Sequence, residues 1–364
     1  MIHGGLSLSF SDIEEIGFGH CCLIRDKHKT SDFENIWSNE QLTPLRDLNK
    51  QNKWSEKCNC QYLEKSGIKS MRMGMNEGLG LSHEYDLTGP YRIDVRFDRQ
   101  CNLACRICGP HSSTYWQKHL RDHSLPDGGI GNPRNKDRVL STLKNIDLSN
   151  LRQFVFSGGE TLMGNDYWEI SEWLVNTVKN SKDQLMLSFQ TNGTQQIPEK
   201  FFHIIEKTNL VKINVSLDGV GDRFEYMRWP SNWNQVTDNL FSLKERLPSN
   251  VMFLIEETIS IFNLAYLEEL ESWAREHFFE NREGDVINHT RHLAEGTYRL
   301  GNVTKEYVES LRNTEYAHLI PSKWQENSDE ITKMILEIKK FDNLRGESFE
   351  KTFPIVASYY SRFL

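Results

Sequence analysis

The sequence predicts an α/β protein built on a partial, TIM-like (β/α)6 barrel, with a small N-terminal cysteine-bearing module and a helical C-terminal segment. From residue 91 onward, strand-like and helix-like segments alternate along the chain. Such alternation is typical of parallel strands joined by right-handed crossovers. The expected strands are residues 91–97, 151–156, 185–190, 211–217, 251–259 and 285–289. The expected domains are residues 1–88, 89–290 and 291–364.

The connections and the C-terminal part follow from helical periodicity and turn residues. Between the strands, apolar and aromatic side chains recur at helical spacing and predict faces that pack against the sheet. Residues 125–133 are rich in turn formers, so they form either a loop over the barrel mouth or a plain surface connection. After residue 292 the strand pattern ends, and Ser328 and Asp329 can cap a helix. One face of that helix carries Ile331, Met334, Ile335 and Ile338.

Composition favours a cytoplasmic enzyme. The chain has 364 residues, of which 38% are hydrophobic, enough to close a core at this length. No apolar run is long enough to span a bilayer, and the start resembles neither a basic leader nor an apolar signal core. A net charge of -8 predicts no general binding to nucleic acid or to an anionic membrane. The seven cysteines all lie between positions 21 and 108, which favours metal ligation over a disulfide framework.

A cysteine motif follows the first expected strand of the barrel. Cys101, Cys105 and Cys108 have the spacing C-x3-C-x2-C, which gathers three thiolates but no fourth. An iron-sulfur cubane normally takes one cysteine per iron, so three cysteines leave one iron open to a substrate or cosubstrate. The motif would lie at the carboxyl end of a strand, where α/β folds place active sites. The alternative is three unrelated buried cysteines.

This spacing resembles the defining signature of the radical S-adenosylmethionine enzymes. The resemblance implies an open-iron 4Fe-4S cluster whose free iron is chelated by the amino and carboxylate groups of S-adenosylmethionine. It further implies a one-electron reductant such as flavodoxin or ferredoxin, reductive cleavage of the cosubstrate to a 5'-deoxyadenosyl radical, and hydrogen abstraction from a substrate. Many members carry an aromatic residue before the third cysteine, whereas this chain has the aliphatic Ile107.

Further motifs stand at the ends of the next three expected strands, in the order that the resemblance requires. They are a Gly-Gly-Glu turn, a Thr-Asn-Gly turn and an Asn-x-Ser-x-Asp run whose polar side chains share one face. Arg228 would pair with a carboxylate of the cosubstrate or substrate, or else lie on the surface or in a helix link. The residues that the resemblance assigns to cosubstrate binding are Gly158, Gly159, Glu160, Asn192, Asn214, Ser216, Asp218 and Arg228.

Four cysteines remain outside this motif, as many as a second cluster requires. Cys58 and Cys60 would face the same way in an extended chain, whereas the neighbours Cys21 and Cys22 would face opposite ways. This region resembles the auxiliary-cluster modules of the twitch-domain and SPASM-type radical enzymes, although those usually follow the barrel. A structural zinc site and a site without metal are the alternatives.

The sequence therefore predicts a radical S-adenosylmethionine oxidoreductase with an auxiliary iron-sulfur cluster. A peptide or small molecule is the favoured substrate, and a carbohydrate or nucleotide is the alternative within the class. A non-catalytic iron-sulfur scaffold or electron carrier is the alternative from another class. The strand-end motifs argue against a carrier, which has no use for a cosubstrate cradle.

Overall fold

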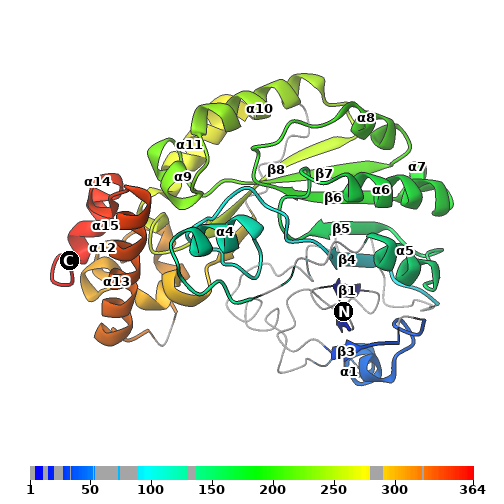
Figure 1. Cartoon of the computed structure of the whole chain (residues 1–364), viewed down its shortest axis with the longest axis horizontal. Coiled ribbons are helices and arrows are strands. Elements are labelled where there is room, and N and C mark those ends of the chain that lie inside the picture. The colour runs from blue at the N-terminus through cyan, green and yellow to red at the C-terminus, as the bar shows by residue number, and fades with distance from the viewer. Residues whose placement is uncertain are drawn as a thin grey trace.

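The computed structural model describes residues 5–10, 15–19, 28–32, 34–51, 53, 73, 88–129, 131, 136–278, 290–321 and 324–364. A twisted sheet of nine strands in the order β3-β2-β1-β4-β5-β6-β7-β8-β9 forms its centre (Figure 1). The strands are β1 (Gly5–Ser9), β2 (Ile16–Gly19), β3 (His28–Thr30), β4 (Arg92–Arg96), β5 (Gln153–Ser157), β6 (Met186–Thr191), β7 (Leu210–Ser216), β8 (Val251–Ile259) and β9 (Thr290–Leu293).

The α/β fold class is confirmed. β4 to β9 are all parallel, and β4 to β8 coincide with the first five expected strands to within two residues at either end. The sixth expected strand, residues 285–289, lies outside the described residues, and β9 begins directly after it. Parallel pairing needs a crossover between strands, and helices supply it here.

The N-terminal strands extend the same sheet, which the sequence analysis did not anticipate. β1 pairs in parallel with β4, and β2 and β3 continue outward as an antiparallel pair. In β1, Leu6 and Leu8 are buried in the main core, so the strand shares the core of the barrel strands. Part of the expected module of residues 1–88 is thus continuous with the sheet. The domain boundaries themselves stay a prediction.

Helices cover one face of the sheet (Figure 1). The main core joins apolar side chains of the strands to those of α5 (Lys136–Lys144), α6 (Asn165–Thr177), α8 (Glu199–Glu206), α10 (Trp233–Arg246) and α11 (Leu267–Phe278). The other helices of this part are α1 (Thr43–Lys50), α4 (Thr114–Asp122), α7 (Ser181–Gln184) and α9 (Asp222–Met227). Short 3-10 helices span Glu40–Leu42, Leu264–Tyr266, Gly296–Tyr298, Leu300–Asn302 and Glu315–Leu319.

The opposite face of the sheet is polar. Because side chains alternate along a strand, the strands that send Phe154, Leu187 and Ile213 into the core send polar residues the other way. In-register pairing places Asp94, Val155, Ser188 and Lys212 in one row across the sheet, so three of these four side chains are polar. Hydrogen bonds link neighbours on this face, such as Asn214 Nδ2 to Ser188 Oγ at 2.9 Å.

The C-terminal helices form a second core beside the sheet. They are α12 (Lys305–Leu311), α13 (Ser328–Arg345), α14 (Phe349–Thr352) and α15 (Pro354–Tyr359), and they lie together at one side of the molecule (Figure 1). The predicted apolar face of α13, from Ile331 to Ile338, is buried. The helix is capped one residue earlier than expected, because Asn327 accepts a hydrogen bond from the Glu330 N–H. None of the described helices is long and apolar enough to cross a membrane.

Candidate active site at the carboxyl edge of the sheet

The cysteine loop, residues 97–113, connects β4 to α4. It contains no helix or strand, and hydrogen bonds to neighbouring segments hold it in position. The Ala104 N–H donates to the carbonyl of Trp229, and the Arg106 N–H donates to that of Met227, both at 2.7 Å. At the far end of the loop, the Ser113 hydroxyl caps α4 and donates to the Leu103 carbonyl at 2.6 Å. The loop is therefore fixed between α4 and the segment that follows α9.

The three cysteines of the loop differ in exposure. Cys105 is buried, Cys101 is half-buried and Cys108 is exposed. Burial raises the pKa of the Cys101 thiol to about 11 and raises the pKa of the Cys105 thiol further. Removal of water from around the Cys108 sulfur raises the pKa of that thiol as well, although other atoms of the residue are exposed. Each negative charge on Cys101 or Cys108 also raises the pKa of Cys105, so the three thiols lie within electrostatic range of one another.

Among the described residues, no group of three or more His, Cys, Asp or Glu side chains is arranged to hold a metal ion. A cubane cluster makes a different demand, because each thiolate binds a different iron atom. The three thiols are soft donors on one short loop, and buried guanidinium groups near Cys105 offset their negative charge. This donor set fits an iron-sulfur cluster.

The Gly158-Gly159 turn after β5 packs directly against the start of the cysteine loop. A Cβ atom on Gly158 would lie 2.5 Å from the Asp98 carbonyl oxygen, and one on Gly159 would lie 2.1 Å from that of Gln100. Gly158 also has a φ of 138°, which other residues rarely adopt. The steric need for both glycines thus comes from the cysteine loop, and the expected approach to a cosubstrate is not required to explain them.

Glu160 is 1% exposed and joins the turns after β5 and β6. Its carboxylate accepts hydrogen bonds from the Thr191 hydroxyl at 2.7 Å, the Asn192 N–H at 2.6 Å and the Leu162 N–H at 3.0 Å. Burial raises the pKa of Glu160, and these hydrogen bonds oppose that effect. With three donors already around it, the carboxylate holds the Thr-Asn-Gly turn in place.

Asn192 links the Glu160 carboxylate to the cysteine loop. Its side-chain amide donates to Asn102 Oδ1 at 3.0 Å and lies 3.9 Å from the Cys101 sulfur. Asn102 donates in turn to the Thr194 hydroxyl at 2.9 Å. Neither Asn102 nor Thr194 was predicted from the sequence. Asn102 directly follows the motif cysteine Cys101 and Thr194 directly follows the Thr-Asn-Gly turn, and this adjacency was the available signal.

Asp218 and Arg228 form a buried ion pair at 2.7 Å. Asp218 is 0% and Arg228 is 7% exposed, so the alternative of a surface arginine does not hold. The second carboxylate oxygen of Asp218 accepts a hydrogen bond from the Thr258 N–H at 2.8 Å. Burial acts to lower the pKa of Arg228, but Asp218 and the nearby Cys105 thiol outweigh it, and the pKa is raised. Arg228 therefore places a positive charge near Cys105.

Asn214 and Ser216 lie on the polar face of the sheet, as the strand alternation predicts. Asn214 is buried and bonded to Ser188, whereas Ser216 is half-buried beside Glu256 of β8. Of these two side chains, that of Ser216 is the more accessible. Cys21, Cys22, Cys58 and Cys60 lie outside the described residues.

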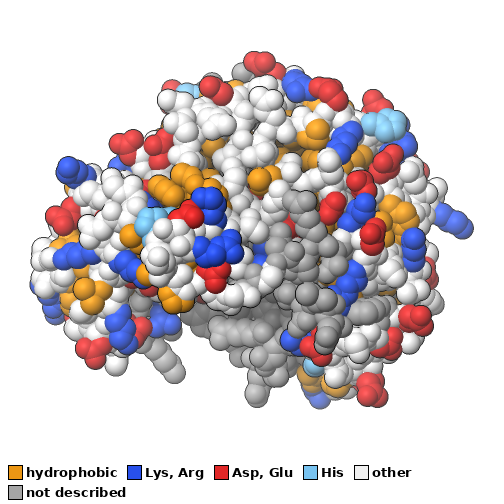
Figure 2. All heavy atoms as spheres, in the orientation of Figure 1, with side chains coloured by type: hydrophobic (Ala, Val, Ile, Leu, Met, Phe, Trp, Pro, Cys, Tyr) orange, Lys and Arg blue, Asp and Glu red, His pale blue; other side chains and the backbone are white. Residues whose placement is uncertain are grey.

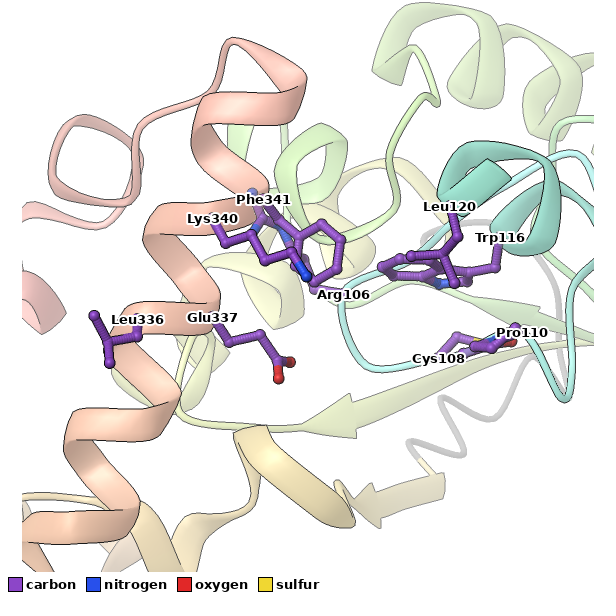
Figure 3. A pocket seen from close by; sticks show the side chains of 10 residues that line it. Arg106, Cys108, Pro110, Trp116, Leu120, Leu336, Glu337, Lys340 and Phe341 are labelled. Atoms are coloured by element: carbon purple, nitrogen blue, oxygen red, sulfur yellow. The ribbon is translucent and has the colours of Figure 1, made fainter. Parts of the chain in front are cut away.

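A pocket of about 390 Å³ opens between the cysteine loop, α4 and α13 (Figure 3). Its lining includes Cys108 of the loop, together with Trp116 of α4 and Phe341 of α13, whose rings contact each other edge to face with centres 5.1 Å apart. Arg106 lies between the loop and α13, with 0% of its side chain exposed, and pairs with Asp342 and Glu347, each at 2.6 Å. This contact was not predicted from the sequence. Its only local sign is a charged residue between two motif cysteines.

Comparison with known proteins gives the class of the site. Residues 95–263 match the Radical SAM superfamily, a match that covers less than half of the 364 residues. These residues therefore form a radical SAM domain, and the match supports the prediction of an enzyme. No curated protein matches the chain.

Several solved structures are similar in part. The structure of anSMEcpe with bound AdoMet and the Cp18Cys peptide has 18% identity and a TM-score of 0.40, and the match covers 70% of this chain and 61% of that one. Streptococcus suis SuiB bound to the precursor peptide SuiA has 11% identity and a TM-score of 0.39, with coverages of 98% and 75%. TsrM from Kitasatospora setae, a radical S-adenosylmethionine methyltransferase with cobalamin and a [4Fe-4S] cluster bound, has 11% identity and a TM-score of 0.33, with coverages of 53% and 37%. The class assignment rests on the domain match alone.

The carboxylate of Glu160 is expected to stabilise the fold of the site. In Glu160→Gln, the amide has a single acceptor oxygen for three buried donors, so the free energy of unfolding should fall by about 1 to 3 kcal/mol. Urea denaturation measures the change. Glu172→Gln, at an exposed position on α6, is the matched control and should stay within about 0.5 kcal/mol of the wild type. Equal stability of the two variants would contradict a stabilising role for the Glu160 carboxylate.

His119 of α4 predicts a pH dependence of stability. It is 3% exposed, and burial, followed by the positive charges of Arg345 and His123, lowers its pKa to about 4. Between this value and the ordinary value of 6.5, only the unfolded chain binds the proton, so the free energy of unfolding should decrease as pH falls from 6.5 to 4. Denaturation at several pH values should show a smaller decrease in His119→Gln. An identical pH profile in both proteins would rule out the buried neutral imidazole.

Proposed function

We propose that this chain is a radical S-adenosylmethionine enzyme that binds an iron-sulfur cubane through Cys101, Cys105 and Cys108 and abstracts hydrogen from a peptide or small-molecule substrate. The observation that carries the proposal is the placement of three thiols on one braced loop, at the edge where the turns after β5 and β6 meet it. The radical SAM match of residues 95–263 supports it. A one-electron reductant is the partner that this reaction needs.

The donor set leaves one iron of such a cubane without a protein ligand, because the loop supplies three thiolates. When bound, the cluster and S-adenosylmethionine would supply the electron and the 5'-deoxyadenosyl radical that the reaction uses. The loop, α4 and the strand-end turns hold the thiols and limit the access of water to them. Cys105 is the best shielded of the three, at 8% exposed.

The residues assigned to cosubstrate binding divide into three groups by burial and contacts. Ser216, half-buried on the polar face, is placed to contact a bound molecule, and the buried Asn192 lies with its amide 3.9 Å from the Cys101 sulfur, where a cluster would bind. Glu160 and Asp218 are buried and already hydrogen-bonded, so we assign them positioning roles. The remaining members, Gly158, Gly159, Asn214 and Arg228, shape the backbone, the polar face and the charge around the loop.

The polar face of the sheet is the surface we assign to the substrate. Its side chains offer hydrogen-bond donors and acceptors, including Gln190, which donates to Glu256 at 3.4 Å. The net charge of -8 favours a peptide or small molecule over a polynucleotide. Figure 2 shows basic and acidic side chains interspersed over the visible face, an arrangement that agrees with this choice.

The decisive experiment is anaerobic incubation with S-adenosylmethionine and dithionite, followed by chromatographic assay of 5'-deoxyadenosine. The wild type, reconstituted with iron and sulfide, should release it. Changing Cys101, Cys105 and Cys108 together to Ala should abolish the release, because the thiolates that hold the irons are gone. Undiminished release by this triple variant would refute the proposed function.

We also propose that Cys58 and Cys60, with Cys21 or Cys22, bind an auxiliary iron-sulfur cluster. Two cubanes predict about eight irons per chain in the wild type and about four in the Cys101/Cys105/Cys108 triple variant. Iron and zinc analysis of reconstituted protein measures both. Zinc in place of iron, or no iron in the triple variant, would contradict the auxiliary cluster and leave the first cluster as proposed.

A further inference from the structure

Two arginines reach across the contact between the cysteine loop and α13, and their guanidinium groups are buried. Arg106 of the loop extends to the end of α13, where Asp342 of the helix and Glu347 just after it bind it, and its guanidinium lies 4.2 Å from the ring centre of Tyr226. In the reverse direction, Arg345 at the end of α13 extends toward α4 and the loop. Arg106 has two carboxylates as partners, so its charge is balanced locally.

Arg345 has a different environment. Its guanidinium lies among three aromatic rings, 4.7 Å from Trp116, 4.8 Å from Trp229 and 5.1 Å from Phe341. The Nε–H approaches His119 Nε2 at 3.4 Å. Among the described residues, the buried Nη1 and Nη2 atoms have no hydrogen-bond partner. Ring faces attract a cation, but burial and the nearby positive charge of Arg106 lower the pKa of Arg345 to about 10, and the Glu347 carboxylate offsets only part of this effect.

The rings connect Arg345 to the cysteine loop. The indole N–H of Trp116 donates to the carbonyl oxygen of Cys105 at 2.9 Å, while the Arg345 guanidinium faces the ring of the same tryptophan. A negative charge on Cys105 interacts favourably with Arg345. Glu347 also interacts favourably with Arg345, and a thiolate at the loop adds further negative charge close to this cation.

We propose that Arg345 is a positioning residue whose buried positive charge raises the reduction potential of the cluster bound by Cys101, Cys105 and Cys108. The inference rests on the proposed function. A reduced cluster carries one more negative charge than an oxidised one, so a nearby cation stabilises the reduced form more strongly. The aromatic rings hold the guanidinium at a fixed place and limit its screening by water.

The test is a potentiometric titration of reconstituted protein with dithionite, in which the reduced cluster is followed by electron paramagnetic resonance. Arg345→Met keeps an apolar chain among the rings and removes the charge. We expect it to shift the reduction equilibrium about tenfold toward the oxidised form, which for one electron corresponds to a potential lower by about 59 mV. Arg345→Lys keeps the charge and should restore most of the potential.

A variant of opposite sign separates charge from packing. Glu347→Gln removes a carboxylate next to Arg106 and leaves Arg345 in place, so the potential should rise. Lys333→Gln, at an exposed position in the first half of α13, is the control and should leave the potential unchanged. A purely structural role for Arg345 predicts no dependence on the sign of the charge removed.

Unchanged potentials in Arg345→Met and Glu347→Gln, with the cluster present in both, would overturn the inference and leave the proposed function intact. If Arg345→Met fails to fold, the potentials of Arg345→Lys and Glu347→Gln decide: a wild-type-like value in the first and a raised value in the second support the inference. A potential that does not rise in Glu347→Gln overturns it. A wild type that binds no cluster at Cys101, Cys105 and Cys108 would overturn the proposed function itself.

Discussion

The close packing of the cysteine loop against the turn after β5 is the constraint on which the rest of the site depends. The two backbones approach so closely that a Cβ at Gly159 would lie 2.1 Å from the Gln100 carbonyl oxygen. The Gly159 and Glu160 N–H groups donate to the carbonyls of Asp98 and Gln100 across this contact. An irregular loop must satisfy its backbone polar groups through its neighbours. This packing therefore fixes the position of the backbone just before Cys101.

Buried charge is the second feature that orders the site. Arg106 lies in the loop, and Arg228 and Arg345 lie beside it. Each buried guanidinium group is stabilised by different partners. Arg228 has one carboxylate partner and Arg106 has two, whereas Arg345 has aromatic rings. Arg228 and Arg345 thereby keep positive charge near Cys105, a thiol whose pKa burial raises. Positive charge near the loop favours the thiolate forms that bind iron.

Local patterns predicted much of the fold. β8 has the predicted bounds, because strand alternation is a property of the segment itself. β1 was missed although its residues alternate, since its place in the sheet depends on β4, more than eighty residues further along. The cap of α13 was misplaced by one residue, because Asn327 and Ser328 are both good capping residues and only geometry distinguishes them.

In the site, the motifs were predictable and their internal partners were not. The three cysteines and the strand-end turns lie together as the motif order implies. Glu160, however, was expected to face a cosubstrate, and its carboxylate is occupied by donors of its own chain. Sequence does not reveal this, because exposure depends on how the turns after β5 and β6 pack against each other.

The contact between Arg106 and α13 changes how the C-terminal segment should be understood. The radical SAM match ends at residue 263, yet the carboxylates that pair with this loop arginine come from Asp342 and Glu347. Without them, a fully buried guanidinium inside the cysteine motif would have no counterion, a state that costs about 3 to 5 kcal/mol. The loop is therefore stable only when residues more than 230 positions away are folded against it. Helix α13 is therefore part of the structural support of the candidate site, although it lies outside the matched domain.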